Sequence, residues 1–299
     1  QALAALAWSQ PPRLWLATQG AQAVNETDGA QVAQASLWGL GRSLALEHAE
    51  FWGGLVDLDP AADPVAAAAQ VQEAVSRTDS EDQQAYRSGQ RYVARLIRQR
   101  GASQIVLPFQ CRADGSYLIT GGMGGLGLEV ARWLVEKGAR RLILMGRTPL
   151  PPRKQWAQVE PDSEAARRIA AIRELETMGA SVHLAFVDVG DAAQLQSFLA
   201  DYEADGWPPI RGVVHAAGVM QYQSVLEHNP DALAHILRPK VNGAWLLHTL
   251  LTDAPLDFFV LFSSTSALLS SPLMGSYAAA NSFLDALAHE RHSLGLPAL

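Results

Sequence analysis

Residues 116–127 read Ser-Tyr-Leu-Ile-Thr-Gly-Gly-Met-Gly-Gly-Leu-Gly, an apolar run that passes directly into a glycine cluster. The run 116–120 predicts a short buried strand. Residues 126–137 then repeat apolar side chains at helical spacing, and Gly138 ends that helix. A strand, a tight turn and a helix in this order open a doubly wound α/β domain, so this stretch decides the fold class.

The glycines of the turn predict a binding site for the pyrophosphate of a dinucleotide. Gly122, Gly124 and Gly127 fit the G-x-G-x-x-G spacing, and the same stretch also fits T-G-x-x-x-G-x-G. Glycine lets the backbone approach an anion closely, and the start of the helix presents free N–H groups to it. A glycine loop without a ligand is the less favoured interpretation, because this one lies between a strand and a helix. The expected cofactor-binding residues of the turn are Thr120, Gly121, Gly122, Gly124, Gly125, Leu126 and Gly127.

The alternation of strands and helices continues to the end of the chain. Further strands are predicted at 141–145, 181–187, 210–215 and 257–263, and helices at about 164–178, 191–204, 230–251 and 276–294. The segment 149–163 is rich in proline and charge and is expected to be a surface loop. Apolar strands that alternate with helices predict a Rossmann-like, doubly wound parallel sheet covered on both faces.

The first part of the chain repeats this rhythm more weakly. Its segments predict strands at 14–17, 54–58 and 91–97 and helices at 31–48 and 64–77, without a glycine-rich turn between strand and helix. We therefore expect two domains, a truncated Rossmann-like subdomain over residues 1–112 that binds no cofactor and a cofactor-binding subdomain over residues 113–299.

Composition excludes several classes of protein. The 299 residues are 48% hydrophobic and 18% charged, which is enough apolar surface for a packed core. The net charge of −7 argues against nucleic acid or an anionic membrane as a partner. The single cysteine, Cys111, has no internal disulfide partner, and no Cys/His cluster has the spacing of metal ligands, so no metal site is predicted. No apolar run approaches the roughly 20 residues that span a bilayer, and a cytoplasmic location is expected.

Arg147 favours NADP(H) over NAD(H) as the cofactor. Folds that bind NAD usually place an acidic residue about twenty residues after the glycine motif, against the ribose 2′-hydroxyl. Arg147 stands at that place. A guanidinium can bind a 2′-phosphate through two hydrogen bonds, whereas a carboxylate repels it. The alternative is a solvated surface arginine.

Two further segments are expected beside the cofactor, each at the end of a predicted strand. Asp188 and Val189 follow the strand 181–187; Asp188 either accepts a hydrogen bond from the adenine amino group or caps the next helix. His215, Ala216, Ala217 and Gly218 close the strand 210–215, and their small side chains leave space for a cofactor ring. For His215 an orienting or structural role is favoured over a catalytic one.

Four polar residues form the candidate catalytic set. Ser264 lies at the end of a predicted strand, where α/β sheets bind ligands. Tyr277 and Asn281 are four residues apart and so share one helical face. Lys240 lies upstream, after Pro239. A single tyrosine would more often belong to the core or the surface, so the set rather than any one residue carries the prediction.

With these segments the chain resembles the short-chain dehydrogenase/reductase superfamily, and specifically the ketoreductase domain of modular type I polyketide synthases. The segments that carry the resemblance are 120–127, 215–218, 238–245, 262–264 and 277–281. Ordinary short-chain reductases carry Tyr-x-x-x-Lys. Here Asn281 stands in place of that lysine and Lys240 comes from upstream, an exchange typical of the synthase ketoreductases.

The resemblance implies NADPH-dependent reduction of a β-ketoacyl thioester on the phosphopantetheine arm of an acyl carrier protein, beside other domains of the same synthase. Tyr277 is then the general acid, Ser264 stabilises the developing alkoxide, Lys240 supplies a positive charge, and Asn281 holds Lys240 or a water in the proton relay. Compared with the family, the start of the structural subdomain and the last strand and lid beyond Leu299 are expected to be missing.

Two other functions stay open, and so does the configuration of the product. One alternative is an NADP-dependent short-chain reductase of a free small ketone, and the other is a reductively silent or epimerising scaffold domain. The family's marks for configuration are a Leu-Asp-Asp motif after the histidine strand and a tryptophan five residues after the catalytic serine. Met220-Gln221-Tyr222 and Leu269 stand at these places, and the missing Leu-Asp-Asp favours the A-type (L-hydroxy) product.

Overall fold

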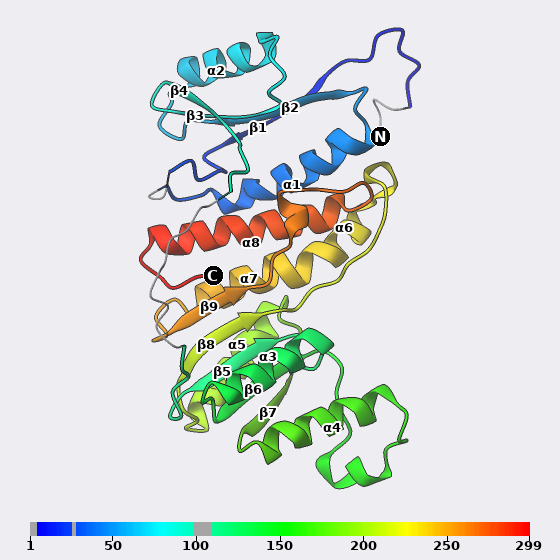
Figure 1. Ribbon diagram of the computed structural model, residues 1–299, viewed down its shortest axis with the longest axis vertical. Coiled ribbons are helices and arrows are strands. Elements are labelled where there is room, and N and C mark those ends of the chain that lie inside the picture. The colour runs from blue at the N-terminus through cyan, green and yellow to red at the C-terminus, as the bar shows by residue number, and fades with distance from the viewer. Residues whose placement is uncertain (1–4, 26–27, 99–108) are drawn as a thin grey trace. The chain divides into compact units, whose positions relative to one another are not determined.

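The computed structural model describes residues 5–25, 28–98 and 109–299 (Figure 1). Its contacts divide the chain into two compact units, and neither unit is continuous in sequence. Unit 1 comprises Gln1–Ser103, Val219–Leu237 and Ser263–Leu296, and unit 2 comprises Gln104–Gly218, Arg238–Phe262 and Pro297–Leu299. None of the described helices is long and apolar enough to cross a membrane.

Unit 2 contains the predicted parallel sheet. Its strands are β5 (Ser116–Thr120), β6 (Arg141–Gly146), β7 (Ser181–Phe186), β8 (Ile210–His215) and β9 (Phe258–Leu261), in the order β7-β6-β5-β8-β9. All four pairings are parallel. The chain reverses its direction of winding between β5 and β8, which makes the carboxyl ends of these two strands the switch point at which open α/β sheets bind ligands. The expected Rossmann-like fold is confirmed.

The helices of unit 2 are α3 (Gly125–Glu136), α4 (Glu164–Thr177), α5 (Ala192–Ala204) and α7 (Gly243–Leu250). Buried aliphatic side chains such as Ile119, Leu134 and Leu144 join α3 to the sheet in one core. The prediction of a surface loop at 149–163 is wrong in part, because Arg153–Gln158 form a 3₁₀-helix. Trp156 in that helix is buried in the same core and donates its indole N–H to the carbonyl of Pro151 at 2.8 Å.

The predicted helix 230–251 is interrupted. It consists of α6 (Pro230–Leu237), a π-helix at Arg238–Asn242, and α7. Pro239 has no N–H to donate to the preceding turn, so the regular α-helical ladder cannot run through this point. The wider turn presents Lys240 as a buried residue.

Unit 1 contains the second sheet, with strands β1 (Leu14–Gln19), β2 (Trp52–Leu58), β3 (Gln83–Arg87) and β4 (Gln90–Val93) in that order. The first two pairings are parallel and the third is an antiparallel hairpin. The sequence did not predict β3, whose polar residues lack an apolar pattern. Gln84 and Arg87 are nevertheless buried there. The strand expected at 91–97 ends earlier in the structure: β4 covers Gln90–Val93, and residues 94–97 lie outside it.

The α-helices among the described residues of unit 1 are α1 (Val32–Glu47), α2 (Pro64–Ser76), α6 and α8 (Gly275–Ser293). Helices α1 and α8 pack closely at Gly39, where an added Cβ would lie 2.2 Å from the carbonyl oxygen of Ala278. Helix α8 was expected within residues 113–299, yet it clusters with α1. The subdomain boundary at 112/113 itself stays a prediction.

Candidate active site

The glycine turn of unit 2 is built by close backbone contacts. Gly121 adopts a positive φ of 66°, which glycine allows without strain. A Cβ at Gly127 would lie 2.3 Å from the carbonyl oxygen of Gly121, so only glycine lets α3 start this close to the turn. The amide of Gly122 donates to the carbonyl of Met145 at 3.1 Å and thereby ties the turn to β6.

The start of α3 has the features that a pyrophosphate needs. Gly124, the N-cap residue, is extended, and no side chain makes a capping hydrogen bond there. Gly124, Gly125 and Leu126 are exposed, and a Cβ at Gly125 would meet no atom within 4 Å. Amide groups at the start of a helix favour an anion in such open space. The residues present therefore fit the cofactor that the sequence predicts, and its binding there stays a prediction.

Thr120 and His215 join the two strands that flank the switch point. The hydroxyl of Thr120 lies 2.8 Å from Nδ1 of His215 and also accepts from the amide of Ala217 at 3.3 Å. A Cβ at Gly121 would lie 3.0 Å from the backbone of Ala216, so the glycine turn and the segment 215–218 are in direct contact. The structure thus brings together two of the predicted cofactor segments.

His215 is held in its neutral form. It is buried at 1% exposure, and this burial is the main reason why the pKa of its imidazole is lowered to about 4. The nearby positive charge of Lys240 contributes to the lowering, while the backbone carbonyls of Pro239 and Lys240 partly offset it. With this pKa the imidazole is uncharged at neutral pH, so it has no acidic imidazolium proton to donate there. The orienting or structural role of His215 stays a prediction.

Lys240 is buried against the segment 215–218. Its Nζ donates to the carbonyl oxygen of Phe262 at 2.6 Å, and a Cβ at Gly218 would lie 2.8 Å from its Cε. Glycine at 218 therefore makes room for the lysine side chain. From Phe262 the chain continues directly to Ser263 and Ser264.

Arg147 and Asp188 follow neighbouring strands. Arg147 is exposed one residue after β6. Asp188 accepts the amide of Gly190 at 2.9 Å and lies 3.5 Å from the guanidinium of Arg238. The alternative that Asp188 caps α5 is wrong, because the capping side chain is Asp191. Val189 beside it is buried.

The pairing with Arg238 was missed at the sequence level. Arg238 also lies 3.6 Å from Asp191, and it belongs to the π-helix that carries Lys240. Its separation in sequence from both acids hides this arrangement, and only the proximity of β7 and the π-helix in the fold creates it.

Ser264, Tyr277 and Asn281 belong to unit 1. The hydroxyl of Ser264 accepts from the amide of Ser266 at 3.2 Å, which leaves its proton to be donated elsewhere. Tyr277 lies in the first turn of α8 and is partly exposed. The side chain of Asn281 is buried and donates to the backbone carbonyl of Tyr277 at 2.8 Å. Lys240 belongs to unit 2, so the convergence of the four residues stays a prediction.

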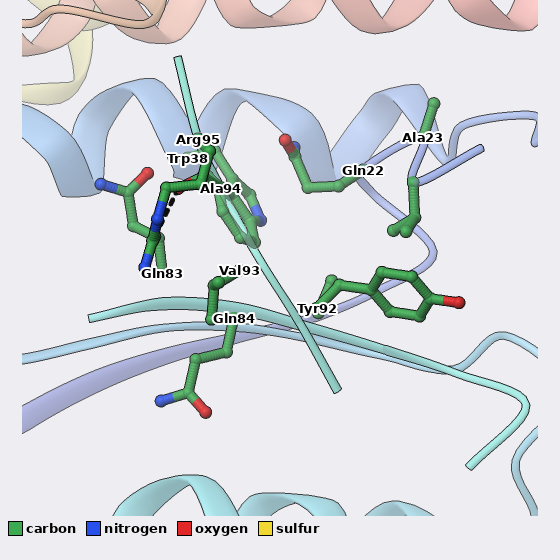
Figure 2. A pocket seen from close by; sticks show the side chains of 11 residues that line it. Gln22, Ala23, Trp38, Gln83, Gln84, Tyr92, Val93, Ala94 and Arg95 are labelled. Atoms are coloured by element: carbon green, nitrogen blue, oxygen red, sulfur yellow. Dashed lines mark hydrogen bonds between the residues drawn. The ribbon is translucent and has the colours of Figure 1, made fainter. Parts of the chain in front are cut away.

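A second candidate site lies in unit 1. A cavity of about 350 Å³ opens between α1 and the sheet, with Trp38, Gln84, Tyr92 and Arg95 among its lining residues (Figure 2). Its polar groups are already paired: Trp38 donates to Thr18 at 3.0 Å, and Gln84 accepts from Arg91 at 2.7 Å. A ligand would have to compete with these bonds, so the cavity is the weaker candidate.

The loop after β1 differs from the glycine turn of unit 2. The amides of Ala21 and Gln22 donate to the carboxylate of Asp57 at 2.8 and 3.1 Å, and Arg87 pairs with the same carboxylate at 2.6 Å. The amides that could face a phosphate thus face a side chain of the protein itself. That the first subdomain binds no cofactor stays a prediction.

Comparison with known protein families divides the chain in two. Residues 115–299 match the model of the KR domain, and residues 1–96 match the model described as "Polyketide synthase extender module SpnB, Rossmann fold domain". The first match contains the glycine turn and all four candidate catalytic residues. Reductases of this family depend on a nicotinamide dinucleotide.

The relatives are large synthases. One protein of the phenolphthiocerol/phthiocerol polyketide synthase of Mycobacterium tuberculosis is 42% identical over 287 residues, which cover 96% of this chain and 15% of that protein. The 5-methyl-1-naphthoate synthase of Streptomyces sahachiroi is 43% identical over 95% of this chain and 16% of its own length. The chain thus spans about a sixth of the length of these multidomain proteins.

Solved structures agree with these matches. An A1-type ketoreductase has a TM-score of 0.82 and 37% identity, over 97% of this chain and 57% of its own. The ketoreductase from the first module of phoslactomycin biosynthesis in Streptomyces sp. HK803 has a TM-score of 0.80 and 36% identity, over 96% of this chain and 63% of its own. With the doubly wound sheet and the family matches, these likenesses show that the chain belongs to the ketoreductase domains of modular polyketide synthases, which are oxidoreductases of the short-chain dehydrogenase/reductase superfamily.

Proposed function

We propose that the chain reduces the β-ketone of a β-ketoacyl thioester, carried by an acyl carrier protein, to the β-hydroxyacyl thioester with NADPH. The observation that carries this proposal is the combination of an open glycine turn at the switch point with the set Lys240, Ser264, Tyr277 and Asn281. Membership of the ketoreductase family supports the reaction class, and the carrier protein and the preference for NADPH are the finer parts of the proposal.

Each residue has a defined part in the reaction. Bound NADPH supplies the hydride for the β-carbon. The phenol of Tyr277 donates its proton to the ketone oxygen, so that one C–H and one O–H bond form as the carbonyl π-bond breaks. The hydroxyl of Ser264 donates a hydrogen bond to the same oxygen and stabilises its developing negative charge.

Lys240 and Asn281 support this proton transfer. A free phenol has a pKa of about 10, so a nearby ammonium helps Tyr277 to release its proton. The buried position of Lys240, whose Nζ donates to the backbone carbonyl of Phe262, supports a fixed charge of this kind. Asn281 holds the backbone of Tyr277 from the next turn of α8 and completes the relay through Lys240 or a water.

The substitution Tyr277→Phe tests the proposal. It removes the proton donor and keeps the ring, so we expect turnover of a diketide thioester surrogate to fall by at least about a hundredfold. Binding of NADPH, followed by its fluorescence, should stay within about twofold of the wild type. Tyr92→Phe is the matched control: it removes a hydroxyl of the half-buried Tyr92, which donates to Gln90 in the first subdomain, and it should keep full turnover. Unchanged turnover in Tyr277→Phe would remove the mechanism.

The substitution Arg147→Gln tests the choice of cofactor. If the guanidinium binds the 2′-phosphate, its loss should raise KM for NADPH about ten- to a hundredfold and leave KM for NADH nearly unchanged. Arg153→Gln is the control, since Arg153 is also exposed and pairs with Glu176 instead. Equal KM changes for both cofactors would contradict the preference for NADPH.

The substrate and the product configuration need their own assay. Activity on a carrier-bound β-ketoacyl chain that far exceeds activity on a free small ketone would decide against a reductase of free ketones. No NADPH oxidation with either substrate would favour a silent or epimerising domain. Chiral analysis of the alcohol tests the A-type product, which the likeness to A-type ketoreductases supports, although a C2-type ketoreductase at 32% identity is also similar.

A further inference from the structure

Glu47, the last residue of α1, joins two segments that lie far away in the sequence. One carboxylate oxygen accepts from the hydroxyl of Ser224 and the amide of Val225, each at 2.9 Å. The other accepts from the amide of Leu273 at 3.0 Å. Glu47 is separated from these partners by 177, 178 and 226 residues, respectively. We call this arrangement the Glu47 clamp.

The two segments are also bonded to each other. The amide of Gln223 donates to the carbonyl oxygen of Leu273 at 2.9 Å, so both backbone polar groups of Leu273 are engaged. Leu273 has a positive φ of 67°, a conformation that a leucine rarely adopts and that its surroundings must hold. The Glu47 carboxylate is one of the two groups that do so.

A second contact lies next to the proposed proton donor. The hydroxyl of Ser276 lies 2.5 Å from Nε2 of His228, and Ser276 is buried. Helix α8 begins at Gly275, so Leu273, Ser276 and Tyr277 all belong to its start. The segment 223–228 is thus hydrogen-bonded both to Leu273, just before α8, and to Ser276 in its first turn.

The positions of the two segments in the chain relate them to the proposed reaction. The segment 219–229 comes after β8, and the segment 265–274 comes after β9, between Ser264 and Tyr277. Both therefore follow the carboxyl ends of parallel strands in the chain, and open α/β sheets bind ligands at such ends. They carry the exposed apolar side chains of Met220, Tyr222, Leu268, Leu269 and Leu273.

We propose that Glu47 is a positioning residue of the reductase, which holds the segments 223–225 and 273 together and thereby sets the place of the first turn of α8 with Tyr277. The inference rests on the proposed function. A carboxylate suits this part because its two oxygens can serve the two segments at once. Glutamine keeps only one of these acceptors and turns its N–H groups toward the other segment, and alanine removes both.

Hydrogen exchange tests the clamp without reference to the reaction. We expect Glu47→Ala to speed up amide exchange at Val225 and Leu273 at least about tenfold, and Glu47→Gln to speed it up at one of the two. Glu50→Gln is the matched control, because Glu50 lies three residues further along the chain and its carboxylate contacts His48. Unchanged exchange in Glu47→Ala would overturn the clamp, whatever the enzyme does.

Kinetics test the positioning role. We expect kcat with a β-ketoacyl thioester to fall about tenfold to a hundredfold in Glu47→Ala and less in Glu47→Gln, with KM for NADPH and the melting temperature nearly unchanged. The ratio of hydroxyl configurations in the product should also move toward a mixture. Lost protection with unchanged kcat and unchanged product ratio would overturn the role. A wild-type protein without ketone reduction would overturn the proposed function, and the exchange result would still decide on the clamp.

Discussion

His215 illustrates how one buried side chain makes the stability of the protein depend on pH. Its imidazole lies at the end of β8, bonded to Thr120, and its pKa is lowered to about 4 from the ordinary value of 6.5. Between these two values the unfolded chain binds a proton that the folded protein does not bind. The contribution of His215 to the free energy of unfolding is therefore fully present above pH 6.5, and it is lost as the pH falls toward 4.

We expect the free energy of unfolding to fall by up to about 3 kcal/mol between pH 6.5 and 4 because of this one group. Urea denaturation at a series of pH values measures the slope. In His215→Gln, which keeps an amide for the hydroxyl of Thr120, the slope over this range should be shallower. His292→Gln, at an exposed position, should keep the slope of the wild type. Equal slopes in His215→Gln and the wild type would contradict this source of the pH dependence.

At the scale of elements, the contact between α1 and α8 depends on a missing side chain. A Cβ at Gly39 would lie 2.2 Å from the carbonyl oxygen of Ala278, which belongs to the backbone of α8 and cannot turn aside. Two residues further along α1, a Cβ at Gly41 would meet the end of the Leu55 side chain at 2.8 Å, which can move. The two glycines thus form a matched pair in one helix.

We expect Gly39→Ala to lower the free energy of unfolding by about 2 kcal/mol, because overpacking against a backbone outweighs the gain of about 1 kcal/mol in helix propensity. Gly41→Ala should change it by less than about 1 kcal/mol, since the same gain offsets a smaller displacement. Thermal unfolding of both variants measures the difference. Equal stability of the two would mean that α1 and α8 are not held at this distance.

The division of the whole molecule into units leads to a prediction about fragments. Helix α8 follows the predicted boundary at 112/113 in the chain, but it clusters with α1, which precedes that boundary. A fragment 113–299 should therefore leave the α1-facing side of α8 uncovered. We expect limited proteolysis to cut α8 in this fragment several-fold faster than in the whole chain. Addition of the fragment 1–112 should restore protection, and an equally protected α8 in 113–299 alone would contradict the prediction.

The sequence alone predicted the features that depend on neighbouring residues. The glycine turn at 120–127, the apolar strand at 210–215 and the helices on either side follow from local spacing, and the structure confirms them. The pattern around Lys240 and Tyr277 was sufficient for the ketoreductase family, which the family models bear out. Strand β3 was not predicted, because its polar residues show no apolar pattern. Arg87, for example, is buried there with hydrogen bonds to Asp57 and to the carbonyl of Gln22, which lie 30 and 65 residues away in the chain.

Tertiary structure decided everything that depends on residues far apart in the chain. The π-turn that buries Lys240, the neutral state of His215 and the three bonds of Glu47 have no local signal. The physical reason is that periodicity and turn propensity record the conformation of a short segment. Burial, the pKa of a buried group and a bond across 226 residues arise only when distant segments pack against each other.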